Sequence, residues 1–138
     1  MISAMNLGRL LSDTARLDPD EIGLIHGEQS WTWAELDTRA NAFRDALHTL
    51  DVKKGDRVLV QSRNSRELIE SLWGIFKAGC VWVPANFRLT PPEIVYLAEN
   101  SGVRAFLFEH EFCRHAEAAK SASVGLQHLI VAGGSYDG

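Results

Sequence analysis

The chain has 138 residues, of which 46% are hydrophobic and 23% are charged, and its formal net charge is -4. This composition is typical of a globular protein and excludes a disordered or fibrous chain, and the length suits one domain with a single core. Because the net charge is negative and the small basic cluster Lys53, Lys54 and Arg57 is interrupted by Gly55 and Asp56, we expect no nucleic acid as a partner.

The first 50 residues carry the signals of a helix, a hairpin and a second helix. Leucines at helical spacing in the segment NLGRLLSDTARLDP predict a short amphipathic helix that ends at Pro19. Two extended runs around Gly27 predict a β-hairpin in which this glycine has a positive φ. Thr32 and Glu35 then have the spacing of a capping box, so we expect the second helix to begin at Thr32.

The remainder of the chain alternates short apolar runs with helical patterns. Such alternation predicts the α/β fold class, with helices packed on the faces of a layered, mostly parallel sheet. The apolar runs are too short for helices and rich in β-branched residues, so they are predicted strands. They lie near residues 57 to 61, 80 to 84, 104 to 108 and 128 to 131.

Capping signals mark where the helices of this part begin and end. Asn64 with Glu67, and Thr90 with Glu93, have the spacing of a capping box, and both pairs precede a helical pattern. Gly79 stands where a left-handed residue is expected to end the first of these helices. We therefore expect one helix between each pair of strands.

We assign residues 1–132 to this α/β unit and residues 133–138 to a flexible tail or a cut end. The tail GGSYDG has two glycines and no apolar residue that would anchor it. The alternative is a phosphate-binding loop, but such a loop needs a lysine and a following helix, and this segment has neither. A linker is therefore the favoured interpretation.

The types of residue at His110, Cys113 and His115 suggest a metal site, but their spacing does not. On a helix the first two share a face, whereas His115 is rotated by about 140° from His110, so the three side chains cannot converge on one ion. We expect packed or solvated side chains and no metal. Cys80 and Cys113 lie far apart without a C-x-x-C motif, which predicts free thiols in a reducing compartment.

The stretch AGCVWVPANFRLTPPEI, residues 78 to 94, is the strongest sign of a ligand site. An apolar run stops at Pro84, Asn86 and Arg88 follow it, and a helix start follows at Thr90. Open α/β sheets bind ligands outside the carboxyl ends of their strands. Asn86 and Arg88 are therefore candidate binding residues. The alternative is that Arg88 bonds to loop carbonyls and holds the turn.

Several motifs occur in an order that points to one family. They are WTWAEL, KKGDRV, the RNS before a helix, KAGCVWVP and NFRLTPPEI. Together, over about residues 5 to 131, they resemble the N-terminal region of AMP-forming acyl-CoA synthetases, which belong to the adenylate-forming ligase superfamily. In some CoA-forming relatives the arginine of the N-x-R motif lies near the CoA nucleotide, which implies a phosphate contact for Arg88, next to Asn86.

The resemblance implies a two-step reaction that uses ATP, Mg and CoA. A carboxylic acid attacks the α-phosphate of ATP to give an acyl-adenylate, and the CoA thiol then displaces AMP. The family's phosphate loop, ribose-binding aspartate and catalytic lysine belong to later parts of such enzymes. We therefore expect no catalytic residue and no metal ligand in these 138 residues, and no cofactor bound to them alone.

Three interpretations stay open at this point. The first is an N-terminal fragment of an AMP-forming carboxylic acid–CoA ligase that is itself inactive. The second is a fragment of an adenylation domain that loads a carrier protein, and the third is a stand-alone module that binds a partner or a nucleotide without catalysis. A fragment leaves apolar surface uncovered, so we expect the chain to self-associate.

The sequence also bears on location. No apolar run approaches the length of about 20 residues that spans a bilayer, and the N-terminus lacks the apolar region of a signal peptide. We therefore expect a cytoplasmic protein without a transmembrane segment.

Overall fold

The computed structural model describes residues 5–133, and its first part confirms the predicted helix, hairpin and helix. Gly27 at the hairpin turn has a φ of 62°. At the second helix the Glu35 N–H donates to the Thr32 hydroxyl at 3.2 Å and the Thr32 N–H donates to the Glu35 carboxylate at 2.8 Å, which completes the capping box. The elements are α1 (Arg9–Leu17), β1 (Ile22–His26), β2 (Gln29–Thr32) and α2 (Trp33–Thr49).

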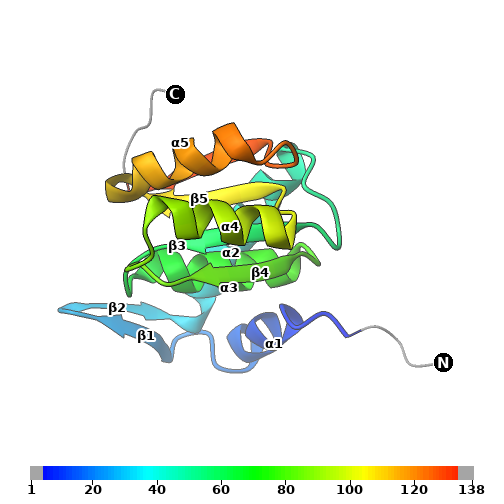
Figure 1. The fold of residues 1–138 in the computed structure, drawn as a ribbon. Helices are drawn as coiled ribbons and strands as arrows, with labels where there is room; N and C mark the ends of the chain where they lie inside the picture. Colours follow the sequence, from blue (N-terminus) through cyan, green and yellow to red (C-terminus); the bar gives the residue numbers. More distant parts are fainter. Residues whose placement is uncertain (1–4, 134–138) are drawn as a thin grey trace.

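The second part contains the parallel sheet that the alternating pattern predicts (Figure 1). Its four strands all pair in parallel, in the order β4-β3-β5-β6, and their observed bounds differ from the predicted ones by at most one residue. The elements are β3 (Arg57–Gln61), α3 (Arg66–Lys77), β4 (Val81–Ala85), α4 (Pro91–Ser101), β5 (Ala105–Glu109), the 3-10 turn η1 (His110–Phe112), α5 (Cys113–Ala122) and β6 (His128–Ala132).

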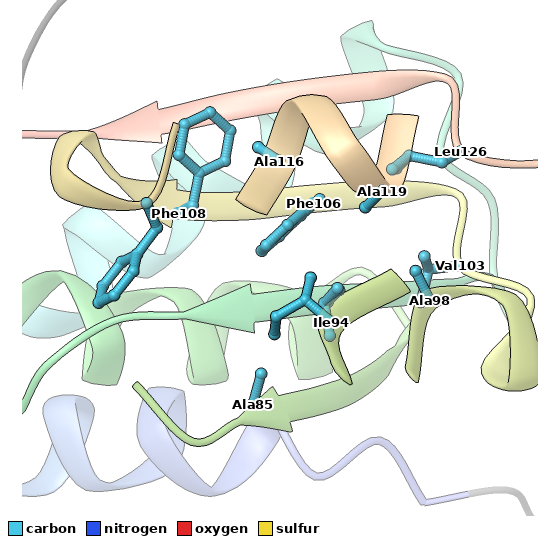
Figure 2. Close-up of a cluster of buried hydrophobic side chains, with 11 residues drawn as sticks. Ala85, Ile94, Ala98, Val103, Phe106, Phe108, Ala116, Ala119 and Leu126 are labelled. Carbon is cyan, nitrogen blue, oxygen red and sulfur yellow. The ribbon is translucent and has the colours of Figure 1, made fainter. Parts of the chain in front are cut away.

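Helices cover both faces of this sheet, because the central strands are apolar on both sides. Successive strand residues point to opposite faces, so Leu59 and Phe106 join a core layer with α4 and α5. Val58 and Leu107 join a second layer with α2 and α3. Figure 1 shows α4 and α5 in front of the sheet and α2 and α3 behind it, and Figure 2 shows the layer that contains Phe106.

A buried lysine ties the first three helices together. The side chain of Lys77 on α3 is 6% exposed, and its ammonium donates to Asp37 at 2.6 Å and to the Asn41 side-chain oxygen at 2.9 Å, both on α2. It also donates to the Ser12 hydroxyl on α1. Burial raises the pKa of Asp37, but the hydrogen bonds from Lys77 and Ser12 outweigh that effect and leave the pKa below its usual value.

The capping box predicted at Asn64 and Glu67 is wrong by one residue. Ser65 is the N-cap of α3, and its hydroxyl accepts a hydrogen bond from the Leu68 N–H at 3.2 Å. Asparagine and serine are about equally good caps, so local preference does not separate these two positions. Ser65 has the extended backbone that a cap requires, with φ -144° and ψ 165°.

The other capping predictions are confirmed. The Thr90 N–H and hydroxyl both donate to the Glu93 carboxylate, each at 2.7 Å, at the start of α4. Gly79 follows the C-cap of α3 with a φ of 72°. These signals depend on residues close together in the sequence, and in the structure the same residues form the helix ends.

Both cysteines are free, as predicted. Burial raises the pKa of the Cys80 thiol to about 11, so this thiol stays protonated at neutral pH. Within residues 5–133, no helix combines the length and the apolar character needed to cross a bilayer. The predicted tail lies mostly outside the described residues, so the boundary at residue 132 stays a prediction.

Candidate functional site

The loops that follow β3, β4 and β5 leave the sheet at one edge, because the strands are parallel and in register. Gln61 at the end of β3 lies opposite Ala85 on β4 and Phe108 on β5. The chain leaves β3 through α3 on one face and leaves β5 through α5 on the other. The strand order therefore reverses between β3 and β5, and open α/β sheets bind ligands at such a point.

Asn86 shapes the loop after β4. Its side-chain oxygen accepts a hydrogen bond from the Arg88 N–H at 2.9 Å, and its backbone carbonyl accepts one from the Leu89 N–H at 3.0 Å. An asparagine that bonds to the backbone two residues later replaces a turn of the main chain. The loop is therefore a compact turn that leads the chain from β4 to α4.

Two arginine guanidinium groups lie over the ring of Phe87 at this turn. The Arg63 Cζ lies 5.0 Å and the Arg88 Cζ lies 5.4 Å from the centroid of its ring. Arg63 also donates to Glu111 at 2.7 and 3.1 Å, and these hydrogen bonds raise the pKa of Arg63 and lower that of Glu111. Within residues 5–133 the structure shows no ion pair for Arg88, so its charge is available to an anion.

The carbonyls of this loop are held by other side chains. His115 Nε2 on α5 lies 3.0 Å from the Leu89 carbonyl oxygen. Gln61 Nε2 makes longer contacts, 3.5 Å to the same oxygen and 3.4 Å to the Asn86 carbonyl oxygen. In the described part of the chain the Arg88 guanidinium makes no hydrogen bond to these carbonyls. The geometry thus gives no support to the alternative in which Arg88 holds the turn.

Sequence reasoning missed Gln61 altogether. The side chain is completely buried, and it ends the apolar run RVLVQ two residues after Leu59, which faces the layer of α4 and α5. A single polar residue at an inward position of such a run is the signal that could have found it. Buried polar groups need partners, so this residue had to meet polar atoms of a neighbouring loop.

For His115 the sequence analysis weighed a metal site and expected a packed or solvated side chain instead, and the structure adds a contact with the Leu89 carbonyl oxygen. His110 lies in η1, before α5 begins, so His110 and Cys113 are not on one continuous α-helix as the sequence analysis assumed. Among the residues that the structure describes, no group of three histidine, cysteine or acidic side chains is placed to hold a metal.

Hydrogen bonds join the loop after β3 to the end of β5. The Glu109 carboxylate accepts hydrogen bonds from the Arg63 N–H at 3.1 Å and from the Ser62 hydroxyl. The hollow beside it has several carboxylates in its wall, and its lining is Ser65, Glu67, Glu109, His110, Glu111, Ala132 and Gly133. Two of these carboxylates are paired, Glu111 with Arg63 and Glu67 with Arg66, whereas Arg88 has no carboxylate partner among residues 5–133.

Comparison with known proteins identifies the family of this chain. Residues 11–136 match the model of the AMP-binding enzyme family. The chain belongs to the AMP-binding enzymes. This finding confirms the resemblance drawn from the motifs. The named relatives described next point to the same family.

Relatives of this member of the AMP-binding enzyme family include CoA ligases several times its length. It is 34% identical over 112 residues to a medium/long-chain-fatty-acid–CoA/3-oxocholest-4-en-26-oate–CoA ligase of Mycobacterium marinum. The aligned part covers 81% of this chain and 20% of the relative. It is 33% identical over 119 residues to a feruloyl-CoA synthase of an Amycolatopsis species, with 86% and 24% covered.

Solved structures confirm the predicted fold. The anthranilate CoA ligase AuaEII, solved in complex with anthranoyl-AMP, matches with a TM-score of 0.89 and 26% identity, over 96% of this chain and 26% of that one. The chain thus spans about a fifth to a quarter of the length of these relatives.

Proposed function

We propose that the chain is the N-terminal part of an AMP-forming ligase that joins a carboxylic acid to CoA. The observation that carries this proposal is the family match over residues 11–136, together with curated relatives that are CoA ligases. The ligase would use ATP and Mg to form an acyl-adenylate, and CoA to form the thioester. The chain would supply one α/β unit of that enzyme and none of its catalytic residues.

Within this ligase we assign Arg88 to a phosphate of the CoA nucleotide and Asn86 to the shape of the loop that presents it. Arg88 is exposed, lies on the Phe87 ring and stands at the carboxyl edge of the sheet. A guanidinium matches the geometry of a phosphate and makes charge-assisted hydrogen bonds with it. Arg63, on the same ring, already has Glu111 as a partner.

The test compares the full-length ligase with the 138-residue chain in two assays. Pyrophosphate release in the presence of carboxylic acids reports adenylation, and thioester formation reports the transfer to CoA. We expect both from the full-length ligase and neither from the chain alone. Thioester formation only on a carrier protein would favour a loading domain, and adenylate formation by residues 1–138 alone would contradict the proposal.

We also propose that the isolated chain associates with itself. Large apolar side chains are more than 70% exposed on and near α1 and the hairpin, among them Met5, Leu17 and Ile25. The edge strand β6 adds half-buried apolar residues, and one side of it pairs with no strand among residues 5–133. Sedimentation equilibrium of the 138-residue chain should therefore give a mass above 15.3 kDa that rises with concentration. A single monomeric species at all concentrations would contradict this expectation.

A further inference from the structure

The turn that carries Arg88 is held from two other elements of the fold. His115 on α5 and Gln61 at the end of β3 both reach the Leu89 carbonyl oxygen, and Gln61 also reaches the Asn86 carbonyl oxygen. Arg88 lies between these two carbonyl groups in sequence. The backbone on both sides of it is therefore tied to the sheet and to a helix.

The chemistry of the acceptor defines how His115 is protonated. A carbonyl oxygen only accepts hydrogen bonds, so His115 Nε2 carries a hydrogen and its N–H donates a hydrogen bond to the Leu89 carbonyl oxygen. His115 Nδ1 is buried and has no partner among the described residues. The ring packs edge-on against Phe112, with centroids 5.5 Å apart and an interplanar angle of 88°, which keeps Nε2 directed at the loop.

The acceptors likewise define the orientation of the Gln61 amide. Its Nε2 donates to both loop carbonyls, and its Oε1 is buried without a partner in residues 5–133. The opposite orientation of the amide would bring its oxygen against two carbonyl oxygens, which repel it. Both side chains therefore act on the turn as hydrogen-bond donors.

We propose that His115 and Gln61 are positioning residues that hold the turn at Asn86–Leu89 and so direct Arg88 at its anion. This inference rests on the proposed contact between Arg88 and CoA. His115 is the stronger of the two donors, because its distance to Leu89 is 3.0 Å against 3.5 Å for Gln61. It acts through the backbone of the turn and touches no substrate itself.

The first experiment compares two substitutions of His115 in the full-length ligase. His115→Phe keeps an aromatic ring but loses the donor, and we expect the apparent KM for CoA to rise about three- to tenfold with adenylation unchanged. His115→Gln keeps an N–H donor and should stay close to the wild type. Equal losses in both half-reactions, or no difference between the two variants, would overturn the inference.

A double-mutant cycle separates this inference from the role of Arg88. If His115 acts through Arg88, His115→Phe has no further effect on the KM for CoA in the Arg88→Ala background. Additive effects would overturn the positioning role. An unchanged KM in Arg88→Ala alone would instead overturn the assigned CoA contact, so the two failures are distinguishable.

A measurement on the 138-residue chain tests the hold on the turn without any activity. We expect His115→Phe to speed amide hydrogen exchange at Arg88 and Leu89, whose N–H groups bond to Asn86, relative to the rest of the chain. The control is His110→Phe, because His110 is exposed and lies in η1. Unchanged exchange in the turn, or the same increase in the control, would contradict the inference.

Discussion

Arg88→Ala in the full-length ligase is expected to weaken the apparent affinity for CoA by about tenfold to a hundredfold, with little change in adenylation. The substitution removes a charge-assisted contact of about 1.5 to 3 kcal/mol. The turn itself should persist, because Asn86, His115 and Gln61 hold its backbone without the Arg88 side chain. Separate assays of pyrophosphate release and thioester formation measure the two half-reactions.

A matched variant controls for the loss of a positive charge. Arg9 is exposed at the start of α1, away from the edge of the sheet that carries Arg88, so Arg9→Ala should leave the affinity for CoA unchanged. If Arg88→Ala instead lowers the melting temperature and impairs both half-reactions together, Arg88 holds the loop. An unchanged dependence on CoA would eliminate the assignment.

Phe106→Ala is expected to lower the free energy of unfolding by about 3 to 5 kcal/mol, a large part of the 5 to 15 kcal/mol of a typical domain. The Phe106 side chain is completely buried on the central strand β5. It packs in one cluster with Ile94 and Ala116, and its ring lies 5.4 Å from that of Phe108 (Figure 2). Truncation would leave a cavity between the sheet and the helices.

Urea unfolding measures this loss, and the variants are compared at one protein concentration because self-association would stabilise the folded state more at higher concentration. Tyr96→Ala is the matched control, because this aromatic side chain is 69% exposed on α4 and its loss should change stability by no more than about 0.5 kcal/mol. Similar losses in the two variants would mean that the layer around Phe106 is not the core.

Helix α5 links the core layer around Phe106 to the turn that carries Arg88. Ala116 and Ala119 of this helix pack in the layer of Phe106, and His115 of the same helix bonds to the turn before α4. The core therefore sets the distance between α5 and the Arg88 loop. This is why a side chain on α5 can influence a site at the end of β4.

The sequence by itself determined the elements and their arrangement in layers. Short apolar runs that alternate with helical patterns predict strands of a parallel sheet with helices on both faces, and the buried strands β3 and β5 agree with that prediction. Capping boxes at Thr32 and Thr90 depend on residues three apart, and a local pattern is sufficient for them. The family followed from motifs of the same local kind.

The tertiary structure alone decided which side chains meet at the edge of the sheet. The partners of the Arg88 turn are Gln61 and His115, which lie 28 and 26 residues from Leu89, and Arg63 meets Glu111 across 48 residues. Such contacts depend on how the strands are ordered and how far each helix reaches, and no local spacing encodes them. The choice of Ser65 over Asn64 as the cap was also beyond the sequence, because the two residues have similar preferences and only the backbone path separates them.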